Sequence, residues 1–137
     1  MTADISGCKA ALAGLDIEDA PATVRQKSRD FFWYSPVLKR LLDDKVGDFV
    51  VSPRNQDEVI QVLAACFAHD VPVPVRGAGT GNYGQAMPLS GGCILHLPYM
   101  DGILELAEGH LTAQPGAIIA GLETAARETG QEIRLYP

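Results

Sequence analysis

Positive charge is in short supply in this sequence of 137 residues. Lysine and arginine together number 11 against 17 aspartates and glutamates, which gives a formal net charge of −6. A nucleic-acid-binding domain needs a basic surface, so we expect no nucleic-acid partner. A long apolar run is also missing, since none approaches the roughly 18 residues that a membrane-spanning helix needs. We therefore expect no membrane span either.

Cysteine is scarce as well. Cys8, Cys66 and Cys93 are widely spaced and odd in number, which excludes a disulfide framework and a zinc ribbon. The three histidines are too dispersed for a metal site. The first residues lack the basic segment and the apolar core of a signal peptide. These absences predict a cytoplasmic protein that holds no metal.

What the sequence does have is a glycine-rich segment, with four glycines in the eight positions 77–84. It follows a short β-type run at 73–75, and no acidic residue occurs between Val71 and Leu97. Glycine lets the backbone approach a ligand closely and adopt positive φ. Successive N–H groups in such a loop form a cradle for phosphate. The segment is therefore the candidate site for a phosphate-bearing ligand.

The pattern from residue 46 onward predicts an α+β fold with a small β-α-β sheet and flanking helices. Residues 49–51 and 73–75 are short β runs, which we expect to pair in parallel through a right-handed crossover. Asn55 and Glu58 form a capping box for the helix between them, which ends near residue 69. Its predicted buried face is Val59, Val62, Leu63, Cys66 and Phe67. Further expected elements are strands at 93–97, 102–106 and 110–114 with a turn at 108–109, a helix over 117–129 with its apolar face at Ile118, Leu122, Ala125 and Ala126, and a strand at 132–136.

Residues 1–45 are predicted to form a helical N-terminal extension, with a first helix over 5–15 and two more that open at Pro21 and Pro36. Four consecutive aromatic residues, 31–34, either form a binding shelf or pack alternate rings onto the main body. Residues 46–137 form the second unit. Its α/β pattern stops part-way, so we expect the sequence to be a piece of a larger protein.

Two common phosphate motifs match the loop only in part. The P-loop motif G-x-x-x-x-G-K-[ST] needs a lysine where this sequence has Gln85. The dinucleotide motif G-x-G-x-x-G is present at 79–84, and Asp101 lies downstream as a candidate ribose ligand. That motif, however, requires a helix directly after the loop, and residues 85–92 contain a proline and two more glycines.

A third template fits better. The string Pro-Val-Arg-Gly-Ala-Gly-Thr-Gly at 74–81 resembles the pyrophosphate loop of FAD-linked oxidases of the vanillyl-alcohol oxidase and p-cresol methylhydroxylase (PCMH) type. Three further motifs of that family occur in order, namely its entry motif at 51–59, its strand motifs at 91–106 and its proline–glycine turn at 115–116. The resemblance covers roughly residues 48–137 and is nearest to the glycolate and D-lactate dehydrogenase-like branch. It implies the first half of a PCMH-type FAD-binding domain, incomplete at the C-terminus.

The cofactor implied by the resemblance is non-covalent FAD. In the family the backbone N–H groups of the loop grip the FAD pyrophosphate, and the proline–glycine turn lies along the cofactor. Arg76 either contacts the phosphate or braces the loop through a carboxylate. Covalent members often carry a histidine in this loop, where this sequence has Thr80. The implied cofactor-binding residues are Arg76, Gly77, Ala78, Gly79, Thr80, Gly81, Asn82, Pro115 and Gly116.

By the same resemblance, the parent protein is a flavin-dependent oxidoreductase that oxidises a 2-hydroxy acid or a similar small alcohol by hydride transfer to the flavin. A separate electron acceptor reoxidises the flavin. The family's second FAD loop and substrate domain come later than Pro137, so we name no catalytic residue and expect this piece alone to be inactive. The alternative is a non-catalytic remnant or interaction subunit, whose exposed edge after Tyr136 is covered by a partner chain or by self-association.

Overall fold

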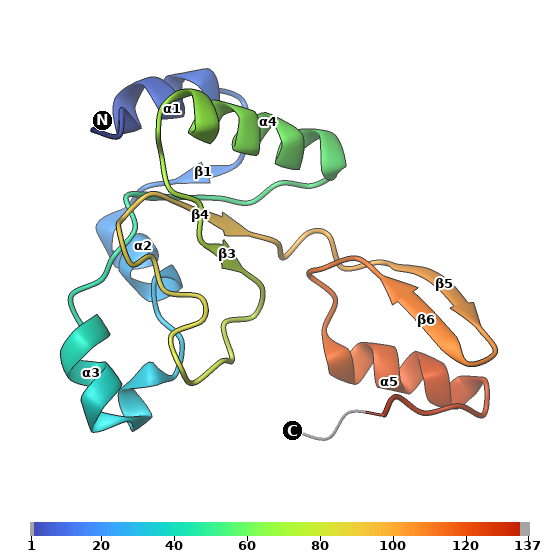
Figure 1. Ribbon diagram of the computed structural model, residues 1–137. Helices are drawn as coiled ribbons and strands as arrows, with labels where there is room; N and C mark the ends of the chain where they lie inside the picture. The colour runs from blue at the N-terminus through green and yellow to red at the C-terminus, as the bar shows by residue number, and fades with distance from the viewer. Residues whose placement is uncertain (1, 135–137) are drawn as a thin grey trace.

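Short strands build the central sheet of the molecule (Figure 1). Their apolar residues alternate between its two faces. The computed structural model describes residues 2–134. This mixture of helices and strands is the α+β class that the sequence predicts. The elements, in chain order, are α1 (Ile5–Ala11), β1 (Ile17–Glu18), α2 (Pro21–Lys27), the 3₁₀ helix η1 (Phe32–Tyr34), α3 (Pro36–Leu42), β2 (Phe49–Val51), α4 (Gln56–Ala68), β3 (Val75–Arg76), β4 (Cys93–His96), β5 (Ile103–Ala107), β6 (His110–Ala113) and α5 (Ile119–Glu128).

The strands of the main sheet are ordered β1-β2-β4-β3. Both β2 and β3 are parallel to β4, while β1 is antiparallel to β2. The β2-α4-β3 unit therefore has the predicted parallel orientation, but the expectation that its two strands pair directly is wrong. The chain that follows the glycine loop returns to the centre of the sheet, and β4 takes the place between them.

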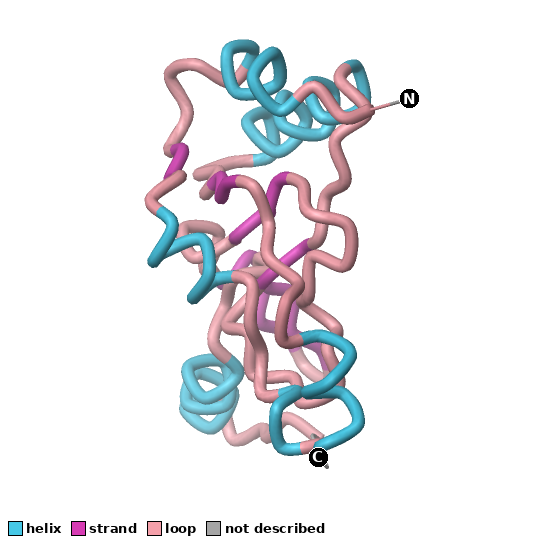
Figure 2. The backbone as a smooth tube through the Cα atoms, turned by 90° about the vertical axis from the view of Figure 1, so that its left-hand side faces the viewer, coloured by secondary structure: helices cyan, strands magenta, loops and turns pink. Residues whose placement is uncertain are grey.

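Helices cover both faces of this sheet. Phe49 and Val51 point to the side covered by α1 and α4, where the larger core lies. Val50 and Ile94 point to the opposite side and pack against Val24 of α2. Figures 1 and 2 show α1 and α4 together on one side of the strands. The carboxyl end of β3 leads directly into the glycine loop.

Helix α4 begins at the predicted capping box. The Oδ1 atom of Asn55 accepts a hydrogen bond from the N–H of Glu58 at 2.9 Å. The Glu58 carboxylate reaches back one residue further than expected and accepts from the N–H of Arg54 at 2.9 Å. One orphan donor of the first turn is thereby satisfied, together with the N–H of the residue that precedes the N-cap.

The predicted buried face of α4 is too wide. Val62 and Cys66 are buried, but Leu63 is 45% and Phe67 is 89% exposed. A single stripe of the helix, spaced by four residues, faces α1 and the sheet, and the adjacent stripe turns toward solvent. The spacing of apolar residues predicts the helix, whereas the width of its buried stripe depends on neighbouring elements that the local pattern does not reveal.

The N-terminal part contains two elements that the sequence did not predict, the 3₁₀ helix η1 and the strand β1, which extends the main sheet. Helix α1 ends at Ala11 rather than near residue 15, and α2 and α3 begin at the predicted prolines. The Sγ atoms of Cys8 in α1 and Cys66 in α4 lie 3.7 Å apart in the larger core. Residues before 46 thus contribute to the same core as the sheet. The predicted domain boundary between residues 45 and 46 stays a prediction.

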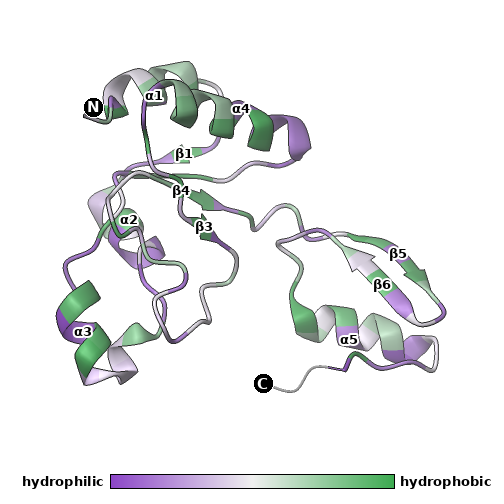
Figure 3. Ribbon diagram, in the orientation of Figure 1, coloured by the Kyte–Doolittle hydropathy of each residue, from purple (hydrophilic) through white to green (hydrophobic). Residues whose placement is uncertain are grey.

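The last part of the described chain is a separate antiparallel hairpin, β5–β6, beside α5 (Figure 1). Its turn falls where predicted, with Gly109 at φ 79°. The strand predicted over 132–136 is wrong for 132–134, which form no strand, and the remaining residues lie outside the described range. The predicted apolar face of α5 is buried only at Ala126, whereas Ile118 is 60% exposed, and Figure 3 shows apolar colour at the start of this helix.

Candidate functional site

The glycine loop follows β3 directly and presents a row of free backbone donors. Among residues 2–134, none of the six N–H groups from Gly77 to Asn82 donates a hydrogen bond to a protein acceptor. No helix follows within 77–92, so the loop lacks the helix N-terminus that the dinucleotide motif requires. Hydrogen bonds from such donors to charged oxygens contribute about 1.5–3 kcal/mol each. The loop is therefore chemically suited to hold an anionic group such as a diphosphate.

Arg76 braces this loop from within the protein. Its side chain is buried, and one terminal nitrogen donates to the carbonyl oxygens of Lys27 at 3.0 Å and Arg29 at 2.5 Å. The other terminal nitrogen donates to the carbonyl of Ala78 at 3.5 Å. Of the two roles left open above, this geometry supports bracing. The acceptors are backbone carbonyls, however, and not the expected carboxylate.

The loop folds closely over the Arg76 guanidinium at Gly79. This residue has φ 71°, and a Cβ atom placed there would lie 2.1 Å from the Nη2 of Arg76. Asp30 supplies the opposite charge, although its Oδ2 and the Nε of Arg76 are both buried without a hydrogen-bond partner among the described residues. Burial lowers the pKa of Arg76, and the attraction of Asp30 opposes that shift.

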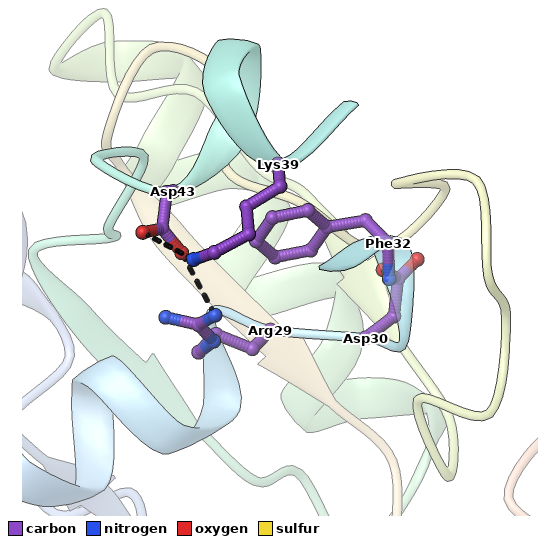
Figure 4. A network of polar contacts seen from close by, with 5 residues as sticks. All are labelled: Arg29, Asp30, Phe32, Lys39 and Asp43. Atoms are coloured by element: carbon purple, nitrogen blue, oxygen red, sulfur yellow. Dashed lines mark hydrogen bonds and ion pairs between the residues drawn. The ribbon is translucent and has the colours of Figure 1, made fainter. Parts of the chain in front are cut away.

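A polar network fixes the backbone that anchors this arginine (Figure 4). Arg29 donates to Asp43 Oδ1 at 2.9 Å, and Lys39 donates to Asp43 Oδ2 at 2.8 Å. The guanidinium carbon of Arg29 lies 5.1 Å from the ring centroid of the buried Phe32. The Oδ1 of Asp30 accepts from the Phe32 N–H at 2.8 Å. The turn between α2 and α3 is thereby tied to the base of the glycine loop.

The loop and the proline–glycine turn meet at one cavity, as the resemblance implies. Gly77, Ala78 and Gly116 line this cavity of about 400 Å³ together with His96 and Asp101. Residues 39 positions apart along the chain are brought together because β3 and β4 run side by side and the hairpin folds back beyond them. Two of the six residues with free N–H groups, Gly77 and Ala78, thus lie in the wall of this cavity.

Close packing at the turn itself requires glycine. The N–H of Gly116 donates to the carbonyl of Met100 at 2.8 Å. A Cβ atom at Gly116 would lie 1.7 Å from the carbonyl oxygen of Leu97, so no other residue fits without a shift of the backbone. The turn is therefore held against the segment that leaves β4, at the cavity wall.

Six of the nine predicted residues lie outside the cavity lining, namely Arg76, Gly79, Thr80, Gly81, Asn82 and Pro115. Gly81 accepts from the N–H of Phe31 at 2.8 Å, and Thr80, Asn82 and Pro115 are exposed. Among the described residues, the side chain of Asn82, one of the implied cofactor-binding residues, makes no hydrogen bond to the protein.

A cluster that sequence reasoning missed lies at the ends of the parallel strands. The Nζ of Lys27, in the last turn of α2, is 3.5 Å from the Nε2 of His96. The Nδ1 of the same ring is 3.4 Å from the Oγ of Ser52. An ammonium group can only donate, so Nε2 accepts and Nδ1 carries the proton. Burial, followed by the charges of Lys27 and Arg76, lowers the pKa of His96 to about 4.

The aromatic run does not pack alternate rings. Phe32 alone is fully buried, whereas Phe31 and Trp33 are each 43% and Tyr34 is 69% exposed. Trp33 and Tyr34 stack with their centroids 4.1 Å apart, and Phe31 lies 6.2 Å from Trp33. An exposed three-ring cluster therefore stands beside the tip of the glycine loop.

Comparison with known proteins places this geometry in a family. The FAD binding domain family matches residues 47–137. The glycolate oxidase subunit GlcD of Bacillus subtilis is 41% identical over 85 residues, which cover 61% of this chain and 18% of that protein. The D-2-hydroxyglutarate dehydrogenase of Stutzerimonas stutzeri is 31% identical over 83 residues, covering 59% of this chain and 18% of that protein.

Two solved structures share the fold. The 4-ethylphenol oxidase from Gulosibacter chungangensis superposes with a TM-score of 0.72 at 20% identity, over 100% of this chain and 28% of that one. A p-cresol methylhydroxylase superposes with a TM-score of 0.67 at 15% identity, over 91% of this chain and 24% of that one. The predicted PCMH-type fold is thereby confirmed.

The chain belongs to the FAD binding domain family, as the resemblance indicated. It spans only about a fifth of the length of the curated relatives it matches. Within residues 2–134, no helix has the length and apolarity to cross a membrane. The same residues include no group of three or more metal-binding side chains placed to hold an ion.

Proposed function

We propose that the residues of this chain hold the diphosphate of a non-covalently bound FAD, as part of an oxidoreductase that acts on a small 2-hydroxy acid. The observation that carries the proposal is the row of six free N–H groups from Gly77 to Asn82, beside the cavity shared with Gly116. Bound FAD would supply the hydride-accepting centre, and the chain's own residues would position it.

The described residues fit such a ligand. At Gly79 and Gly116 the Arg76 guanidinium and the Leu97 carbonyl oxygen take the place of a Cβ atom, so these glycines let the loop and the turn pack tightly beneath a ligand. Gly77 has open space where a Cβ atom would stand, so a ligand can approach its backbone closely. Four or five N–H bonds of about 1.5–3 kcal/mol each hold a dianion without a lysine in the loop itself. Thr80 offers no nitrogen or sulfur for a covalent link to flavin, which supports non-covalent binding.

The substrate class is supported by the relatives. One relative is called a glycolate oxidase subunit and another a D-2-hydroxyglutarate dehydrogenase, and both names describe oxidation of a 2-hydroxy acid. A separate electron acceptor then removes the electrons from the flavin.

The test uses the full-length protein that carries this sequence. We expect visible flavin bands, or their recovery after FAD is added, and release of the flavin into the supernatant when the protein is denatured. Without oxygen, glycolate, D-lactate or D-2-hydroxyglutarate should bleach the flavin. Ethylene glycol, which lacks the carboxylate, is the matched control. A protein that neither contains nor takes up FAD would refute the proposal.

The second candidate is a non-catalytic domain that needs a partner chain. It is favoured by the exposed apolar side chains Ile103, Leu104, Ile118 and Ile119 on β5 and at the start of α5. Such a domain would bind FAD without bleaching by any 2-hydroxy acid, and it would self-associate or recover turnover only with a second subunit. Sedimentation together with the anaerobic bleaching assay separates the two functions.

A further inference from the structure

The carboxyl ends of the three parallel strands converge on one small cluster of polar side chains. Ser52 follows β2, Arg76 ends β3 and His96 ends β4. Lys27, the last residue of α2, completes the cluster through its contact with His96. In sheets of parallel strands, ligands bind beyond the carboxyl ends. The cluster therefore lies where the topology favours a ligand.

The two cations of the cluster are not equivalent. Arg76 is held by three carbonyl oxygens and faces the charge of Asp30. Lys27 has no carboxylate within ion-pair distance among residues 2–134, and its hydrogen bond to His96 is long, at 3.5 Å. Burial and the repulsion of Arg76 lower the pKa of Lys27. Lys27 is thus a half-buried positive charge that lacks a counter-ion.

The ammonium group of Lys27 lies close to the cavity wall. His96 lines the cavity together with Gly77, Ala78 and Gly116, so the ammonium of Lys27 lies one imidazole ring behind the wall. The six free N–H groups begin at the residue after Arg76. An anion on the loop would lie close to this charge in a partly desolvated setting, where screening by solvent is weaker than at the surface.

We propose that Lys27 is a cofactor-binding residue contributed by the N-terminal part of the chain, and that it supplies the counter-charge for a diphosphate held by residues 77–82. The inference rests on the proposed function and adds a residue that lies outside the family match at 47–137. His96 is a positioning residue in this arrangement, because it holds the ammonium through Nε2 while Ser52 holds the ring through Nδ1.

The test measures binding of FAD, ADP and riboflavin to the full-length protein by calorimetry. Lys27→Met, which keeps the length but removes the charge, should weaken FAD and ADP about tenfold or more, equivalent to about 1.4 kcal/mol. Riboflavin, which has no phosphate, should bind unchanged. Lys27→Arg should retain most of the affinity for FAD. The matched control is Lys9→Met. Lys9 lies in α1, which covers the face of the sheet opposite to α2, and it pairs with Asp19.

The inference is overturned if Lys27→Met weakens FAD no more than Lys9→Met does, or if FAD and riboflavin lose affinity equally. Equal losses would mean that Lys27 only maintains the structure, and a fall in the unfolding midpoint would accompany them. If the unaltered protein binds no FAD, the proposed function fails and this inference fails with it. The unaltered protein therefore separates failure of the function from failure of the residue assignment.

Discussion

Replacing Arg76 tests whether the glycine loop is held by its own preceding residue. Arg76→Met keeps much of the side-chain volume but removes the donors to the carbonyls of Lys27 and Arg29. It also leaves Asp30, which is 5% exposed, as a buried carboxylate without its opposite charge. The variant therefore loses the two shorter charge-assisted hydrogen bonds of Arg76, besides the one of 3.5 Å to Ala78, and leaves one buried charge uncompensated.

The expected loss follows from these contacts. Hydrogen bonds from a charged donor contribute about 1.5–3 kcal/mol each, so removing two costs about 3–6 kcal/mol if the carbonyls stay dry. If water reaches these carbonyls and replaces the lost hydrogen bonds, the loss of stability falls toward about 3 kcal/mol. That loss is a large part of the roughly 5–15 kcal/mol that stabilises a typical domain. Arg76→Lys keeps the charge but cannot serve both carbonyls with one planar group, so it should recover only part of the loss.

Urea unfolding followed by circular dichroism measures the effect as a shift of the midpoint at constant slope. Arg54→Met is the matched control, because Arg54 is largely exposed and its contact with Asp16 is at 4.0 Å. We expect the control to change stability by no more than about 0.5 kcal/mol. If Arg76→Met behaves like the control, the guanidinium does not brace the loop and the reasoning is refuted.

Three further predictions concern the turn, the histidine and the thiols. Gly116→Ala should destabilise the protein by about 1–3 kcal/mol and weaken FAD binding, because its Cβ would overlap a carbonyl, whereas Gly121→Ala, with open space around it, should be neutral or stabilising in urea unfolding. His96 has a folded pKa of about 4 against 6.5 when unfolded, so the unfolded chain takes up the proton first as pH falls. Stability should therefore drop between pH 6.5 and 4, and His96→Asn should flatten that drop; an unchanged slope would contradict the buried neutral ring. A hydrogen bond with Cys93 on β4 is the main cause that lowers the pKa of Cys66 to about 7. All three thiols are nevertheless buried, so Ellman's reagent should react with them only after unfolding.

Much of the local structure could be predicted from the sequence because its causes are local. The prolines that open α2 and α3, the Asn55–Glu58 box and the turn at Gly109 act through the dihedrals and donors of a few neighbouring residues. The glycine loop belongs to the same class, since its composition predicts close approach and free N–H groups wherever the chain places it. For that reason the candidate ligand class was also readable from the sequence.

The α+β class, the position of the glycine loop and its family resemblance all follow from the order of residues, because periodicity and motif order are properties of the chain. Only the tertiary structure decided the strand order, the exposure of Phe67, and the role of Arg76 as a brace to carbonyls. It also brought Lys27 to His96 across 69 positions of sequence, which no local pattern records. Such pairings depend on which elements pack together, and packing is settled by the whole core at once.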